Sequence, residues 1–270
     1  MANLAPLAAP IGVFDSGVGG LSVLRALRAR LPAETFVYVA DSGHAPYGDR
    51  SPEFVETRAT EVARFLMRRN SKAMVIACNT ASVLVVANLR GIHTVPVVAM
   101  EPAIKPAVLV TKSKVVLVLA TTATIRSESV ARLCNVYGDG IRIILQACPG
   151  LAEKVERAEF SSPATRQLLR EYILPAIGEG ADTIVLGCTH YAFLAAEIAA
   201  TAGSSVTIVE SSDAIARQLT HVLPTAASES GPIVPKTRFY TSGSTALLTS
   251  FLTAVGEPFE QVFALPAGEA

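Results

Sequence analysis

Short apolar runs alternate with amphipathic segments along almost the whole chain of 270 residues. The runs are rich in Val and Ile and carry little charge, which is typical of parallel strands that helices cover on both faces. The pattern predicts strands at 11–14, 36–40, 73–77, 95–99, 115–120, 141–146, 183–187 and 206–209, and helices at 21–30, 52–69, 124–135, 163–179 and 191–201. We therefore expect the α/β class, with two similar doubly wound domains and parallel central sheets.

The chain is long enough for two compact domains, although one large domain is compatible with the same length. We expect a first domain of residues 1–100 plus 214–270 and a second domain of residues 101–213. After a turn-rich stretch at 225–235, a strand at 237–240 and a helix at 245–255 are expected to return to the first domain.

The composition is balanced, with 23 basic and 23 acidic residues and no Trp. It gives no electrostatic reason to expect a nucleic acid or an anionic membrane as the partner. No apolar run approaches the roughly 20 residues that span a bilayer, and the amino-terminal tail lacks the pattern of a signal peptide. We expect a cytoplasmic protein with free thiols, and the spacing of Cys and His does not suggest a metal site.

Two of the four cysteines follow apolar runs in matching positions. Cys78 is followed by Asn79 and Thr80, and Cys188 is followed by Thr189. Most buried cysteines are inert packing, but these two lie at predicted carboxyl ends of parallel strands, where ligands bind. Each also precedes a predicted helix N-terminus, whose partial positive charge lowers a thiol pKa. The pattern predicts a cleft with one thiol on each side.

Two loops lie near this predicted cleft. The glycine-rich stretch at 15–20 follows the first strand, and it is neither the dinucleotide-binding pattern nor a P-loop. Asp15 or Ser16 could cap the next helix, yet an acid in an otherwise uncharged turn suggests a further role. The loop at 41–48 reads either as the lip of a pocket or as an ordinary turn.

Further polar residues follow other strands. His190 is a candidate proton carrier beside Cys188. Thr121 and Thr124 could bind a ligand or cap a helix. Glu153 and Glu156, taken alone, read as solvated residues of a helix.

The stretches 11–22, 41–48, 77–82, 101–107 and 186–191 resemble the motifs of the aspartate/glutamate racemase family. They occur in the same order over nearly the whole chain. Within that family, residues 15–20, 46–48 and 101–102 are similar to the glutamate-specific members.

The resemblance implies a cofactor-independent, two-base interconversion of L-glutamate and D-glutamate, which supplies D-glutamate for peptidoglycan. Cys78 then takes the α-proton from D-glutamate with help from Asp15, and Cys188 takes it from L-glutamate with help from His190. The auxiliary glutamate aligns with Glu156, and a shift onto Glu153 stays open. The implied substrate contacts are Asp15, Ser16, Tyr47, Gly48, Asn79, Thr80, Thr121, Thr124, Thr189 and His190. The resemblance also implies a homodimer, a small-molecule substrate and a site in the cleft between the domains.

Two other interpretations stay open at this point. One is a related racemase that acts on aspartate or a hydantoin. The other is a flavodoxin-like binding module in which both thiols serve only as packing.

Overall fold

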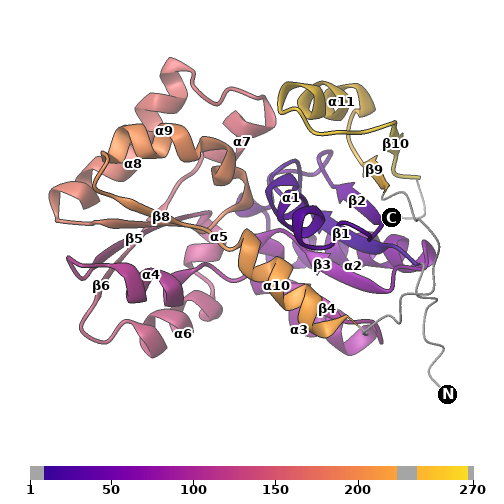
Figure 1. Ribbon diagram of the computed structural model, residues 1–270, viewed down its shortest axis with the longest axis horizontal. Helices are drawn as coiled ribbons and strands as arrows, with labels where there is room; N and C mark the ends of the chain where they lie inside the picture. Colours follow the sequence, from indigo (N-terminus) through magenta and orange to yellow (C-terminus); the bar gives the residue numbers. More distant parts are fainter. Residues whose placement is uncertain (1–8, 224–235, 267–270) are drawn as a thin grey trace.

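The computed structural model describes residues 9–223 and 236–266 of the chain. Within these ranges it forms two sheets, and all their strand pairs are parallel (Figure 1). The strands of the first sheet are β1 (Ile11–Asp15), β2 (Phe36–Ala40), β3 (Ala73–Ile76), β4 (Val97–Ala99), β9 (Thr237–Thr241) and β10 (Val262–Ala264). Those of the second sheet are β5 (Val115–Ala120), β6 (Arg142–Ala147), β7 (Thr183–Leu186) and β8 (Thr207–Val209).

Four strands of the first sheet, β2-β1-β3-β4, have the same order as the four strands of the second. The first runs β10-β9-β2-β1-β3-β4 and the second runs β6-β5-β7-β8. Strand β1 is therefore flanked by β2 and β3 as β5 is flanked by β6 and β7. In each sheet the order changes direction at the central strand, which is where α/β proteins form their ligand sites. The prediction of two similar α/β units with parallel sheets is confirmed.

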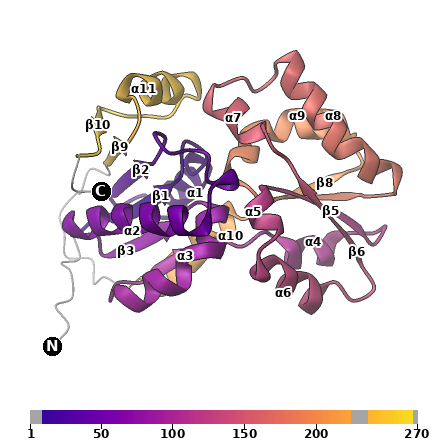
Figure 2. The same ribbon diagram turned by 180° about the vertical axis from the view of Figure 1, so that it is seen from behind.

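The helices lie in two groups around these sheets (Figures 1 and 2). Beside the first sheet lie α1 (Leu21–Arg30), α2 (Pro52–Arg68), α3 (Asn79–Ile92), α10 (Ser212–Val222), α11 (Thr245–Ala254) and the short 3₁₀ helix η1 (Tyr47–Asp49). Beside the second lie α4 (Ile104–Val110), α5 (Thr122–Ile125), α6 (Glu128–Tyr137), α7 (Leu151–Glu156), α8 (Pro163–Gly178), α9 (Ala195–Ala202) and the 3₁₀ helix η2 (Thr189–Leu194).

Two of the predicted helices differ from the observed ones. The helix expected at 124–135 is divided into α5 and α6, because Ser127 caps α6 by accepting a hydrogen bond from the Val130 amide. The helix expected at 191–201 is preceded by the 3₁₀ turns of η2, and α9 begins only at Ala195. The remaining predicted helices agree with the structure to within about a residue at each end.

Apolar side chains cover both faces of each sheet. One cluster lies on one face of the first sheet, around Ile11 and Val13, and continues to Leu117 and Ile184 of the second sheet. A second cluster covers the opposite face of the first sheet, around Phe14 and Val39. The two units therefore share a continuous apolar core on one side.

The carboxyl-terminal segment completes the first sheet. Strand β9 pairs with β2, and β10 pairs with β9. In Figure 1 these yellow elements lie beside the indigo strands β1 and β2, although most of the chain separates them in sequence. The stretch at 225–235, which we expected to be rich in turns, lies outside the described residues. Within the described residues, no helix is both long and apolar enough to cross a membrane.

Candidate functional site

Cys78 lies between β3 and α3 and occupies the N-cap position of that helix. Its Sγ accepts a hydrogen bond from the Ala81 amide at 3.5 Å, and its thiol donates to Ser16 Oγ at 3.5 Å. The residue is only 4% exposed. Burial, followed by the negative charge of Asp15, raises the pKa of Cys78 to about 12. The Ala81 amide at the helix N-terminus does lower the pKa of Cys78, as we expected, but desolvation of the thiolate outweighs it and the net shift is upward.

Cys188 lies in the corresponding position after β7 of the second sheet. It is 7% exposed, and its Sγ lies 3.7 Å from His190 Nδ1. The segment after it is the 3₁₀ helix η2, so the α-helix N-terminus that the sequence predicted is absent there. The imidazole supplies the neighbouring positive charge instead. The strands β3 and β7, which precede the two cysteines, hold equivalent places in their sheets, and Cys188 is close enough for its charge to raise the pKa of Cys78.

Asp15 ends β1 and is completely buried. Its Oδ1 accepts a hydrogen bond from the Gly17 amide at 2.7 Å, and its Oδ2 accepts one from the Thr189 hydroxyl at 3.0 Å. The second bond joins the first unit to the loop that carries Cys188. Burial raises the pKa of Asp15 to about 6, against the lowering effect of the nearby His190 charge. A carboxyl group with this pKa can exchange a proton near neutral pH.

The buried His190 pairs with Glu156, whose side chain is partly exposed. His190 Nε2 lies 2.6 Å from Glu156 Oε1, and the same oxygen accepts a hydrogen bond from the Val18 amide at 2.8 Å. Burial lowers the pKa of His190, but the hydrogen bonds to Cys188 and Glu156 outweigh it and hold that pKa well above its ordinary value. The imidazolium is therefore favoured beside Cys188. Glu156 makes this contact, whereas Glu153 lies one turn earlier on α7.

The hydroxyls of three threonines meet where the two units face each other. Thr80 Oγ1 lies 2.8 Å from Thr121 Oγ1 and 3.3 Å from Thr124 Oγ1, and Thr121 donates to Thr124 at 3.0 Å. Thr121 also caps α5 by accepting from the Thr124 amide at 3.2 Å. The two interpretations of this cluster, helix cap and ligand group, therefore both suit the geometry.

The Asn79 side chain has hydrogen-bonding atoms without partners. Asn79 is 2% exposed, and within the described residues neither its Oδ1 nor its Nδ2 has a hydrogen-bond partner. Buried amides are nearly always paired. An amide in this state next to Cys78 indicates a place for a polar ligand.

The loop at 41–48 contacts the second unit through Gly48. A Cβ atom at Gly48 would come within 2.8 Å of the Thr121 Cβ, so a side chain there would force the units apart. Tyr47 is buried, and its hydroxyl donates to Asp41 Oδ2 at 2.5 Å. The phenol is therefore directed to Asp41, and a ligand would meet the ring or backbone of Tyr47.

Sequence reasoning missed the group that holds this loop. Arg58, on α2, donates to Asp41 Oδ2 through Nε at 3.0 Å and to Asp41 Oδ1 through Nη2 at 2.8 Å. An arginine in an amphipathic helix normally reads as solvated, so only the buried strand-end acid Asp41 could have suggested a partner.

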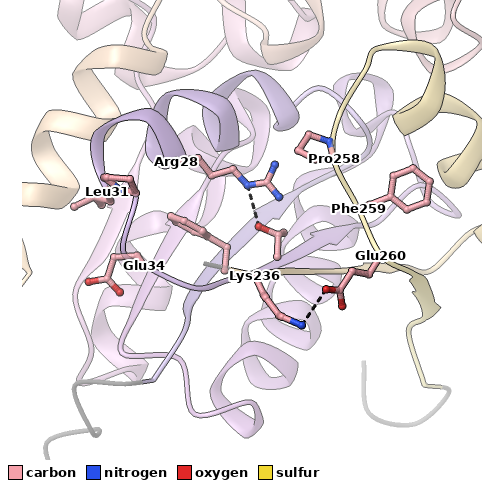
Figure 3. Close-up of a pocket in the computed structure, with 10 residues that line it drawn as sticks. Arg28, Leu31, Glu34, Lys236, Pro258, Phe259 and Glu260 are labelled. Carbon is pink, nitrogen blue, oxygen red and sulfur yellow. Dashed lines mark hydrogen bonds and ion pairs between the residues drawn. The ribbon is translucent and has the colours of Figure 1, made fainter. Parts of the chain in front are cut away.

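A separate hollow of about 420 Å³ lies on the outer side of the first unit (Figure 3). Arg28 donates to Thr237 Oγ1 at 3.0 Å, and Lys236 pairs with Glu260 at 2.9 Å. These charged groups are engaged with the protein itself, and none of the residues predicted for the site lines this hollow. Within the part of the chain described, no three His, Cys, Asp or Glu residues are arranged to hold a metal ion.

The arrangement can move protons to and from a carbon atom from two sides. Each thiol has a neighbouring acid–base group: Asp15 on the Cys78 side and His190 on the Cys188 side. Hydroxyls and the Asn79 amide supply donors for a carboxylate whose charge grows in the transition state.

Comparisons with known proteins point to one group. The family model described as Asp/Glu/Hydantoin racemase matches residues 11–219. A glutamate racemase from Methylococcus capsulatus is 49% identical over 262 residues, which cover 97% of each chain. The crystal structure of a glutamate racemase isoform from Bacillus anthracis has 33% identity and a TM-score of 0.86, covering 96% of this chain and 98% of that one. A glutamate racemase from Francisella tularensis, solved in complex with D-glutamate, has 27% identity and a TM-score of 0.81, covering 98% of this chain and 100% of that one.

Proposed function

Because this chain belongs to the Asp/Glu/Hydantoin racemase family, we propose that it interconverts L-glutamate and D-glutamate without a cofactor and so supplies D-glutamate for peptidoglycan synthesis. The observation that carries the proposal is the pair of buried thiols at equivalent strand ends, each with its own acid–base neighbour. The preference for glutamate is inferred from relatives that are named glutamate racemases and that match this chain over nearly their whole length.

In the proposed reaction one sulfur acts as thiolate and the other as thiol. The Cys188 thiolate removes the α-proton of L-glutamate and forms an S–H bond, while the electron pair of the broken C–H bond passes into the carboxylate. The Cys78 thiol then gives its proton to the opposite face of the carbon, which yields D-glutamate and leaves a thiolate at Cys78. The reverse reaction exchanges these roles, so no proton or electron is lost.

The neighbours of each thiol control its proton. Asp15, as a carboxylate, accepts the proton of Cys78 and so allows that thiol to act as a base toward D-glutamate. His190, as an imidazolium held by Glu156, stabilises the thiolate of Cys188. Racemisation of D-glutamate is therefore expected to require an ionised Asp15, with a pKa of about 6.

The remaining proposed contacts surround the substrate. We propose that the hydroxyls of Ser16, Thr80, Thr121 and Thr124 bind the carboxylates and amine of glutamate. The Asn79 amide, which has no hydrogen-bond partner among the described residues, would join them. Thr189 binds Asp15 and adds a further hydroxyl. Tyr47 and Gly48 close the site from the loop at 41–48.

We propose that residues 1–100 and 214–270 form one domain and residues 101–213 the other. The pairing of β9 with β2 supports this division, as does the contact of α10 with α1 and β4. We further propose that the protein is cytoplasmic and that it forms a homodimer; the dimer rests on the family resemblance alone. Light scattering of the purified protein tests the dimer, and a monomer at micromolar concentration would contradict it.

A racemase assay tests the function. Dialysed enzyme with EDTA and no added cofactor should convert L-glutamate and D-glutamate to the racemic mixture, followed by circular dichroism. L-aspartate and a hydantoin serve as competing substrates. A higher kcat/KM for either of these substrates than for glutamate would indicate the related racemase activity instead. Purification with a bound flavin would favour a binding module.

The thiols are tested with matched variants. Cys78→Ala and Cys188→Ala should each lower kcat by at least about 10³-fold, because each removes one of the two acid–base groups. Cys134→Ala removes a thiol from α6, outside the cleft, and should leave kcat within about twofold of the parent. Substantial turnover by either of the first two variants would remove the thiol from the mechanism.

A further inference from the structure

The peptide unit between Gly17 and Val18 is held from both ends. Its carbonyl oxygen accepts a hydrogen bond from the Tyr38 hydroxyl at 2.8 Å. Its N–H, which belongs to Val18, donates to Glu156 Oε1 at 2.8 Å. The preceding N–H, of Gly17, donates to Asp15 Oδ1 at 2.7 Å. Adjoining backbone groups thus contact the assistants of both thiols.

Peptide geometry couples these contacts. In a planar trans peptide unit the C=O and N–H bonds point in opposite directions, so fixing the oxygen fixes the direction of the N–H. The Tyr38 hydroxyl holds the oxygen from the first unit, and the N–H is thereby aimed at Glu156 in the second. Glu156 in turn contacts His190, which lies beside Cys188.

Tyr38 is itself rigidly placed. It lies on β2, is completely buried, and packs its ring against Phe239 of β9 with centroids 5.8 Å apart. Gly20 leaves room for the hydroxyl, since a Cβ there would approach it to 3.0 Å. Burial and the nearby Asp15 charge keep the pKa of Tyr38 well above its ordinary value, so the phenol remains a donor at the pH of any assay.

We propose that Tyr38 is a positioning residue of the racemisation site. Through the carbonyl of Gly17 it orients the Val18 amide that holds the Glu156–His190 pair on the Cys188 side, and it restrains Gly17, whose own amide holds Asp15 on the Cys78 side. This inference rests on the proposed function, because the groups that it positions are the proposed assistants of the thiols. In this role Tyr38 acts through the Gly17 carbonyl and needs no contact with substrate or sulfur.

The test is removal of one oxygen atom. Tyr38→Phe should lower kcat on the order of tenfold in both directions, with KM changed less than about twofold, because misplaced acid–base groups slow the chemical step. The acid limb of kcat/KM for D-glutamate should move to higher pH, since the Gly17 amide lowers the pKa of Asp15 and would be less firmly aimed. Tyr240→Phe, on the adjacent strand β9, is the matched control and should change neither quantity.

Rescue separates positioning from packing. Replacing Tyr38 by 4-aminophenylalanine keeps a donor and should restore kcat and the pH profile, whereas 4-fluorophenylalanine fills similar space without a donor and should behave as Tyr38→Phe does. A folded Tyr38→Phe protein with parental kcat and pH profile would overturn the proposal. Equal losses of kcat in the amino and fluoro variants would also overturn it, because a loss that does not depend on the hydrogen-bond donor reflects packing.

A failure of the proposed function gives a different result. If the parent enzyme does not racemise glutamate, the Asp15 carboxyl can still be titrated by ¹³C NMR. A higher Asp15 pKa in Tyr38→Phe than in the parent would then support the positioning role, and an unchanged one would overturn it.

Discussion

Asp15 shows how a single buried acid can reduce the stability of the folded protein. Its carboxyl group is completely buried and carries a pKa of about 6, compared with an ordinary value of 3.8. The native state therefore binds this proton more tightly than the unfolded state does. Stability from this group is full below about pH 4, declines as the pH rises, and is lost above about pH 6.

We predict that Asp15→Asn stabilises the protein at pH 8 and impairs racemisation. The neutral amide avoids the cost of burying a charge, which the pKa difference places on the order of 3 kcal/mol. The gain in the free energy of unfolding, measured with urea, should be present above about pH 6 and disappear near pH 4. A variant less stable than the parent at pH 8 would show that the hydrogen bonds of the carboxylate outweigh its desolvation.

Some properties of single residues could be predicted from the sequence and others could not. The two thiols, Asp15 and His190 could be singled out because each follows a predicted strand. The pKa of Cys78 could not be predicted, because it depends on how far the surrounding core excludes water. Tyr38 gave no signal, since a tyrosine within an apolar run reads as ordinary packing.

At the scale of elements, strands were predicted better than the segments that follow them. The strand at 36–40 was predicted to the residue, because uncharged β-branched runs have few alternative structures. The short strand β10 was missed, since three residues carry too little pattern to identify a strand. Helix α8 was recognisable from Ser162 and Pro163, which act as N-cap and first helical residue. The division of 124–135 into two helices depends on caps that compete with continued helix.

The loop at 41–48 depends on a buried ion pair between two elements. Asp41 follows β2 and Arg58 belongs to α2, and the exposed fractions of their side chains are 0% and 12%. Hydrogen bonds from Arg58 and the Tyr47 hydroxyl keep the pKa of Asp41 below its ordinary value despite burial. Removing the arginine would leave a buried carboxylate with fewer partners.

We predict that Arg58→Met lowers the free energy of unfolding by about 3–5 kcal/mol and raises KM for glutamate. The loop that carries Tyr47 and Gly48 would lose its anchor. The double variant Arg58→Met with Asp41→Asn should recover part of the stability, because the buried charge is gone. Arg68→Met changes an exposed arginine on the same helix and controls for loss of charge alone. Urea titrations that fail to separate Arg58→Met from Arg68→Met would contradict this assignment.

The whole molecule brings together residues that the sequence keeps far apart. Four strands have the same order in the two sheets, and this order places Cys78 and Cys188 at corresponding strand ends. Contacts across the cleft then join the units through Asp15, Thr189 and Glu156. The repeated pattern of strand, thiol and hydroxyl residue made this arrangement predictable. The pairing of particular side chains across the cleft was not, because it depends on how the two units pack.

The position of deuterium in early product tests the central claim most directly. L-glutamate is incubated with enzyme in deuterated water, and both enantiomers are separated and examined by ¹H NMR before a tenth of the substrate has reacted. With a separate base on each face, newly formed D-glutamate should carry deuterium at the α-carbon while the recovered L-glutamate keeps its proton. Equal labelling of substrate and product, or D-glutamate that retains the original proton, would contradict a reaction between two opposed thiols.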